Sequence, residues 1–104
     1  MKLFISQPMR DKTDAEILAE RKRLIEVAER TTGEKMEPLD TFFTDYTPDA
    51  NYQGVAFLGR SIMALADADL AIFGPEWEQY RGCRIENQIC VDYGIPIIES
   101  YSKR

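Results

Sequence analysis

Histidine is absent from the 104-residue chain. Its absence excludes Ser-His-Asp and Cys-His nucleophilic sites, histidine-rich zinc sites and imidazole acid–base catalysis. Any chemistry must therefore use carboxylates, hydroxyls, thiols, lysine or arginine. A glycine-rich phosphate loop is also missing, because the segment Ser6-Gln7-Pro8-Met9-Arg10 after the first predicted strand contains no glycine. This absence argues against ATP-type and NAD-type sites.

Long apolar runs are absent too, and no stretch approaches the ~18 residues of a membrane span. The apolar part of the opening segment MKLFISQPMR is too short for a secretory signal. A net charge of −5 argues against binding to the phosphate backbone of a nucleic acid. We therefore expect a cytoplasmic protein that binds neither a membrane nor a nucleic-acid polymer.

Cysteine is scarce, with only Cys83 and Cys90 in the chain. Both fall in one predicted helix, where seven positions correspond to about 10 Å of rise, so the two thiols cannot pair. Two thiols without histidine also make a poor zinc site. We expect buried or half-buried thiols and no metal.

The composition, with 44% apolar and 30% charged residues, predicts one globular domain over residues 1–104. A chain this short forms a modest core and no deep, enclosed site within one subunit. We therefore expect the protein to form at least a homodimer.

Strands and helices alternate in the predicted order. Thr13 and Glu16 have the spacing of a capping box, and Gly33 is a typical helix stop. Apolar periodicity predicts strands near residues 2–6, 35–39, 68–73 and 95–98, and helices near 13–31, 51–66 and 82–94. This order predicts an α/β class, a Rossmann-like or flavodoxin-like doubly wound domain with a mainly parallel sheet of about four strands.

Several finer expectations follow from the same patterns. The charged face of the first helix, which includes Arg21, is expected to be solvated. The aromatic-rich stretch 40–51 is expected to be a long, functional loop or lid. In the third helix, Ile85, Ile89 and Val91 are expected to face inward.

A strand order of 2-1-3-4 would place the topological switch between the first and third strands. The loops over residues 6–12 and 74–81 would then flank a crevice, with the start of the third helix pointing into it. Glu86 lies near that helix start, whose positive end should keep its carboxylate ionised, as a nucleophile requires. The alternative is a surface glutamate that only stabilises the helix end.

Other candidate residues lie in the same two loops. Ser6, Gln7 and Arg10 are suited to holding a phosphate or a sugar hydroxyl. Trp77 and Tyr80 can stack on a nucleobase, or alternatively fill the edge of the core or a subunit interface.

The chain resembles the nucleoside 2-deoxyribosyltransferase superfamily, and within it a short phage and bacterial branch near the nucleotide N-glycosidases. The resemblance is carried by the segments Lys2-Leu3-Phe4-Ile5-Ser6-Gln7-Pro8-Met9-Arg10, Ala66-Asp67-Ala68-Asp69-Leu70-Ala71, Gly82-Cys83-Arg84-Ile85-Glu86 and Tyr93-Gly94-Ile95-Pro96. It implies a Rossmann-like fold and cleavage or transfer at the N-glycosidic bond of a (deoxy)nucleoside or nucleoside 5′-monophosphate, without a metal or organic cofactor. It also implies that Glu86 attacks the anomeric carbon and that Arg10 helps to bind the 5′-phosphate.

Three positions depart from the transferases of that family. Phe4 stands where they have a tyrosine, and Ser61 and Tyr80 stand where they have aspartates. The resemblance places these three residues and Gly82 at the substrate. The departures keep open a catalytically weak nucleotide-binding or signalling module of the same fold, and a protein that acts through protein contacts.

Overall fold

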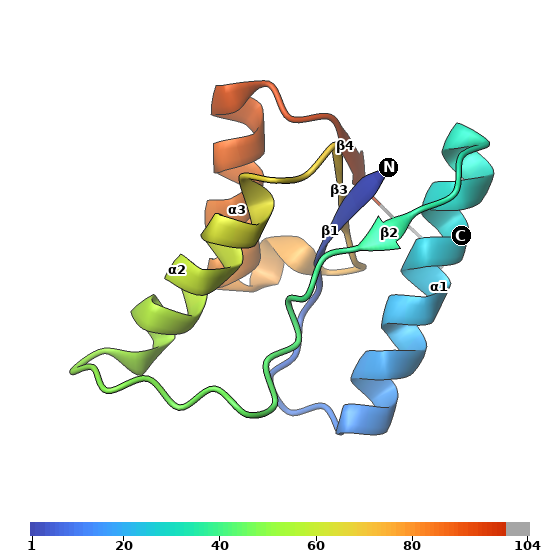
Figure 1. Cartoon of the computed structure of the whole chain (residues 1–104). Coiled ribbons are helices and arrows are strands. Elements are labelled where there is room, and N and C mark those ends of the chain that lie inside the picture. Colours follow the sequence, from blue (N-terminus) through green and yellow to red (C-terminus); the bar gives the residue numbers. More distant parts are fainter. Residues whose placement is uncertain (100–104) are drawn as a thin grey trace.

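The computed structural model describes residues 1–99, which form an α/β fold around a four-stranded sheet. The strands are β1 (Lys2–Ser6), β2 (Glu37–Pro38), β3 (Leu70–Phe73) and β4 (Ile97–Glu99). They lie in the order β2-β1-β3-β4, and each neighbouring pair is parallel (Figure 1). The predicted architecture and strand order are confirmed, so the topological switch lies between β1 and β3.

Three helices cover the two faces of this sheet. They are α1 (Asp14–Thr32), α2 (Gln53–Leu65) and α3 (Arg81–Tyr93), and a short 3₁₀ helix, η1 (Trp77–Gln79), precedes α3. Helix α1 lies on one side of the sheet, and α2 and α3 lie on the other (Figure 1). Among these helices none is long and apolar enough to cross a membrane.

The pleat of the strands divides the core into two clusters, because successive side chains point to opposite faces. Leu3 and Ile5 pack with Leu24 of α1. Phe4, between them in sequence, packs on the other face with Leu65 and Cys90. The two central strands, β1 and β3, are therefore buried on both faces, as in other parallel sheets covered by helices, whereas the edge strand β2 is exposed.

The ends of α1 follow from local chemistry. The Oγ1 atom of Thr13 accepts a bond from the Glu16 backbone N–H (3.1 Å), and the Glu16 carboxylate accepts one from the Thr13 N–H (2.8 Å). Gly33 ends the helix in the left-handed conformation at φ 73°. The predicted capping box and stop are confirmed. They fix where α1 begins after the loop that leaves β1.

Helix α3 buries a face that differs in part from the one predicted, since Ile89 packs against the core as expected. Ile85 is 38% exposed and Val91 is 61% exposed, whereas Cys83, Glu86 and Cys90 are buried. The expectation that Ile85 and Val91 face inward is therefore wrong. The inward stripe follows the spacing of Cys83, Glu86 and Cys90, which lie three and four residues apart on one helix face. Both thiols are free and buried, as predicted.

Candidate functional site

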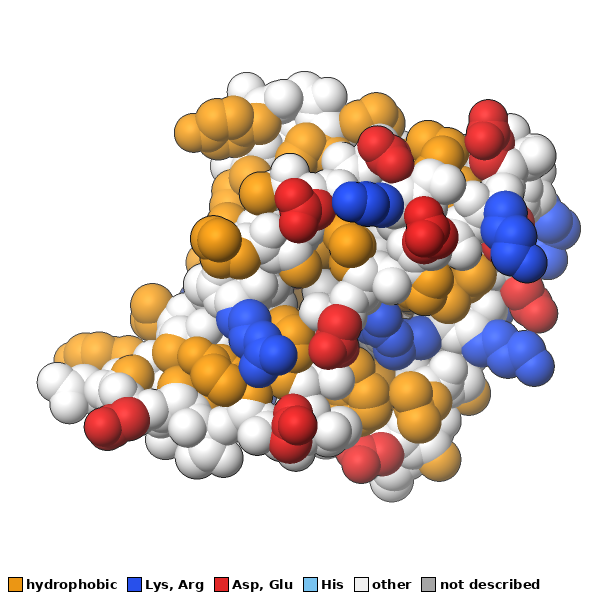
Figure 2. Space-filling model, in the orientation of Figure 1, with side chains coloured by type: hydrophobic (Ala, Val, Ile, Leu, Met, Phe, Trp, Pro, Cys, Tyr) orange, Lys and Arg blue, Asp and Glu red, His pale blue; other side chains and the backbone are white. Residues whose placement is uncertain are grey.

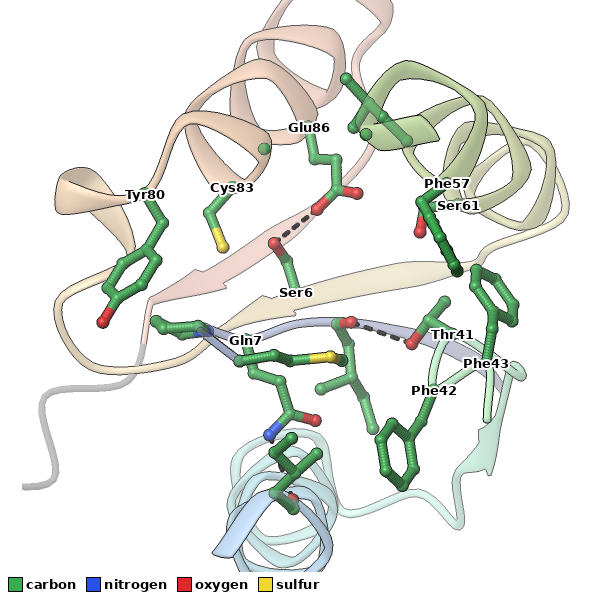
Figure 3. Close-up of a pocket in the computed structure, with 17 residues that line it drawn as sticks. Ser6, Gln7, Thr41, Phe42, Phe43, Phe57, Ser61, Tyr80, Cys83 and Glu86 are labelled. Carbon is green, nitrogen blue, oxygen red and sulfur yellow. Dashed lines mark hydrogen bonds between the residues drawn. The ribbon is translucent and has the colours of Figure 1, made fainter. Parts of the chain in front are cut away.

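A cavity of about 440 Å³ opens at the carboxyl edge of the sheet, where the switch point lies. Its walls come from the loop after β1, the β2–α2 loop (residues 39–52), one side of α2 and the start of α3 (Figure 3). This volume is in the usual range for a site that holds a small molecule. The chain leaves the buried strand β3 at this edge and passes through η1 into α3, whose first turns lie beside the cavity.

Glu86 points from the second turn of α3 toward the end of β1 (Figure 3). The Oγ of Ser6 donates a hydrogen bond of 2.6 Å to its Oε1, and the residue is only 7% exposed. Burial raises the pKa of Glu86 from 4.5 to about 7, although the bond from Ser6 opposes the rise. The expectation of a carboxylate kept ionised by the helix end is therefore wrong. The field of a helix end fades beyond the first turn, and burial dominates further along.

The two thiols beside Glu86 stay neutral. Burial raises the pKa of Cys83 to about 11, and the charge of Glu86 adds to this rise. Burial raises the pKa of Cys90 to about 11 as well, again with a contribution from Glu86. A thiol must lose its proton to act as a nucleophile. Glu86, as the one carboxylic acid among the described residues that line the cavity, is the better reactive group.

Aromatic rings form the opposite wall. Phe42 and Phe43 come from the β2–α2 loop and Phe57 comes from α2 (Figure 3). The rings of Phe43 and Phe57 are stacked, with centroids 6.4 Å apart and planes 24° apart. The guanidinium of Arg60 lies 4.2 Å from the centroid of Phe43 and 4.6 Å from that of Tyr46. These contacts attach the loop to α2, and the three phenylalanines make this side of the cavity apolar.

Most of the predicted site residues surround this cavity. Those that line it are Ser6, Gln7, Ser61, Tyr80, Gly82 and Glu86. Arg10 is exposed outside the lining, and its guanidinium lies 5.4 Å from the centroid of the Tyr80 ring, at the rim.

Phe4 and Trp77 lie elsewhere. Phe4 is fully buried in the core cluster next to α3. Trp77 packs against Phe73, with ring centroids 5.4 Å apart, so it fills the edge of the core, which was the alternative considered for it. Neither side chain belongs to the cavity lining.

The contacts of Arg21 were not foreseen from the sequence. The expectation that its side chain is solvated is wrong. The side chain is half-buried and donates bonds to Gln7 and Thr41, both of which line the cavity. Thr41 is buried and also donates to the carbonyl of Ile5 (3.2 Å). The aromatic content of residues 40–51 predicts a functional loop, and Thr41, Phe42 and Phe43 of this loop line the cavity. No local pattern distinguishes Arg21 from the exposed Lys22.

A Rossmann-like parallel α/β fold does not by itself specify an activity, since this architecture supports many unrelated reactions. Within residues 1–99, no group of three or more cysteine, aspartate or glutamate side chains is placed to hold a metal ion. The chain matches no protein-family model, and neither the curated proteins nor the solved structures contain a significant match.

Proposed function

We propose that this protein cleaves, or transfers a sugar across, the N-glycosidic bond of a (deoxy)nucleoside or nucleoside 5′-monophosphate, with Glu86 as the nucleophile. The observation that carries the proposal is the buried Glu86 carboxyl, which Ser6 holds at 2.6 Å on the wall of an aromatic-lined cavity. The resemblance of the segment from Gly82 to Glu86 to the nucleoside 2-deoxyribosyltransferases supports the same assignment.

In the proposed reaction, an ionised oxygen of Glu86 attacks C1′ of the sugar. The C1′–N bond breaks, its electron pair leaves with the base, and the base takes up a proton from water. Water or a second base then attacks C1′ and releases the glutamate, so configuration is retained over the two displacements. Ser6 binds Oε1, which orients the carboxylate and leaves Oε2 for the attack. A pKa of about 7 places half-ionisation near neutral pH.

The other walls suit the remaining parts of such a substrate. The rings of Phe42, Phe43 and Phe57 offer an apolar surface on which a flat base stacks. The hydroxyl of Ser61 and the amide of Gln7 supply polar partners. A 5′-phosphate would have to lie at the rim near Arg10, because no lysine or arginine is among the lining residues of the described chain.

The experiment is a panel of deoxynucleosides, ribonucleosides and their 5′-monophosphates, with free base measured by chromatography. We expect wild-type protein to release base from a member of the panel and Glu86→Gln to lose that release. Glu26→Gln removes the same charge from an exposed position on α1, and this variant should still release base. Release that persists in Glu86→Gln would show that another group is the nucleophile.

A nucleotide-binding or signalling module is the second candidate. It is favoured by the lack of a second carboxylic acid among the described lining residues, since Ser61 and Tyr80 stand where the related transferases carry aspartates. Saturable binding of a nucleoside or nucleotide, without base release by wild-type protein, would support this candidate over the enzyme.

We also propose that two copies pair through α2. Its exposed side includes Val55 and Met63, which are 67% and 74% exposed, and Tyr52 just before it is 76% exposed. Figure 2 shows hydrophobic side chains gathered over this helix. Exposed apolar side chains that gather on one helix are typical of a surface that contacts another protein. Arg60 is the one charged residue of α2, so a second copy would present an equivalent apolar face with no carboxylate to bury.

A further inference from the structure

The side chain of Arg21 extends from α1 toward the carboxyl edge of the sheet. Its Nη1 donates to Oε1 of Gln7 (3.3 Å) and to Oγ1 of Thr41 (2.9 Å), and its Nη2 donates to the carbonyl of Leu39 (3.2 Å). Burial lowers the pKa of Arg21, and the charge of Asp40 opposes that shift. An arginine nevertheless stays protonated in proteins, so α1 delivers a permanent positive charge to this position.

This guanidinium determines which way the Gln7 amide points. Gln7 is 6% exposed, and its Nε2 donates to the carbonyl of Ile17 (3.1 Å). A guanidinium only donates and a carbonyl only accepts, so Oε1 must face Arg21 and Nε2 must face Ile17. If the amide were reversed, its NH₂ group would face the Arg21 guanidinium and its oxygen would face the Ile17 carbonyl, and neither pair can form a hydrogen bond. The bond to Ile17 uses one hydrogen of Nε2, and Gln7 is one of the residues that line the cavity.

The same side chain holds the start of the β2–α2 loop. Leu39 and Thr41 both accept bonds from it, and Thr41 in turn donates to β1 through the carbonyl of Ile5. The residues that follow, Phe42 and Phe43, form the aromatic wall. The position of that wall relative to β1 therefore depends on the bonds from Arg21.

We propose that Arg21 is a positioning residue of this site, which fixes the Gln7 amide and the β2–α2 loop so that a ligand is bound in one orientation. It lies outside the cavity lining and acts through Gln7 and Thr41. The kinetic part of this proposal rests on the proposed function, whereas the effect on Gln7 does not. Loss of a hydrogen bond to a charged group typically changes binding by about tenfold.

The first test needs no substrate. The side-chain NH₂ signals of Gln7 are followed by NMR, and their hydrogen exchange is compared in wild type, Arg21→Met and Arg21→Lys. Lys22→Met is the matched control, because Lys22 is exposed on the same helix and loses the same charge. We expect exchange at Gln7 to be about tenfold faster in Arg21→Met and unchanged in Lys22→Met. Arg21→Lys should recover only part of the protection, since one ammonium cannot reproduce the planar fork.

The second test uses whichever nucleoside or monophosphate the wild-type protein cleaves. We expect KM to rise about tenfold in Arg21→Met with a smaller change in kcat, and the pH midpoint of kcat to stay at the wild-type value. A purely structural role would lower the unfolding midpoint and leave the KM of the folded protein unchanged, which would overturn the proposal.

The two proposals fail in different ways. If the wild type cleaves nothing in the panel, the proposed function fails, and the Gln7 signals still test Arg21. If the side-chain hydrogens of Gln7 exchange at the same rate in Arg21→Met as in the wild type, the positioning role is overturned, whatever the activity. If Arg21→Met does not fold, Arg21→Lys takes its place: faster exchange at Gln7 supports the role, and unchanged exchange overturns it.

Discussion

Replacing Glu86 by glutamine is expected to stabilise the protein above neutral pH while it removes the proposed nucleophile. The substitution keeps the size of the side chain, and the glutamine Oε1 can still accept the bond from the Ser6 hydroxyl. The main change is that position 86 loses its negative charge. The experiment therefore measures how much stability the folded protein loses when it holds an ionised carboxylate in this cavity.

The magnitude follows from the raised pKa of Glu86. A shift from 4.5 to about 7 corresponds to about 3 kcal/mol of preference for the neutral form in the folded protein. Below pH 4.5 the carboxyl is neutral in both the folded and unfolded states, so stability is unaffected. Between pH 4.5 and about 7 the folded state holds more protons than the unfolded chain, and the free energy of unfolding falls as pH rises. Above about pH 7 the free energy of unfolding stays lower by this full amount.

The assay is urea unfolding of wild type, Glu86→Gln and the exposed control Glu26→Gln near pH 4.5 and near pH 8. Between these values, the wild type should lose up to about 3 kcal/mol more stability than Glu86→Gln. Glu26→Gln should follow the wild type. Cys83 and Cys90 share the environment of Glu86, but their pKa values of about 11 keep them neutral throughout this window. Parallel pH dependences for wild type and Glu86→Gln would refute the reasoning.

Three further predictions follow from the contacts around the cavity. Ser6→Ala removes the bond that lowers the pKa of Glu86, so the pH at which base release reaches half its maximum should rise; an unchanged or lower midpoint in the pH–rate profile would contradict this. Arg60→Met removes two cation–π contacts, each worth about 0.5–2 kcal/mol, so backbone amide hydrogen exchange in the β2–α2 loop should become faster. Unchanged exchange would show that Arg60 does not hold the loop. Met63→Glu places a charge on the exposed face of α2, so sedimentation velocity should show a monomer where the wild type is a dimer. A variant that associates like the wild type would exclude pairing through this face.

The fold was predictable because its signals are local. Thr13 and Glu16 show the start of α1 in four consecutive residues, and Gly33 shows its end. The apolar run from Leu70 to Phe73 predicts a buried strand, and alternation of strands and helices then favours a parallel sheet. Strand β2 gave a weaker signal, because Pro38 interrupts it and only two residues pair.

The site was less predictable because it depends on residues that meet only after folding. Gln7, Arg21 and Thr41 are separated by 14 and 20 positions, yet one guanidinium joins them. The inward face of α3 was mispredicted for a related reason. Apolar periodicity assumes that the helix packs on an apolar core, but the start of α3 faces a cavity, so Glu86 is buried there while Ile85 is partly exposed.

The burial of Glu86 distinguishes it from a residue retained for packing. No cation lines the cavity within the described chain, so the carboxylate has no ion pair to offset its desolvation, and the bond from Ser6 reverses only part of the pKa rise. A neutral side chain of the same size would fill the position without that loss. Perturbed acids of this kind cluster at functional sites. If Glu86 is the reactive group, activity must appear as pH rises through its own ionisation, and Ser6→Ala must move the activity profile and the titration of Glu86 by the same amount.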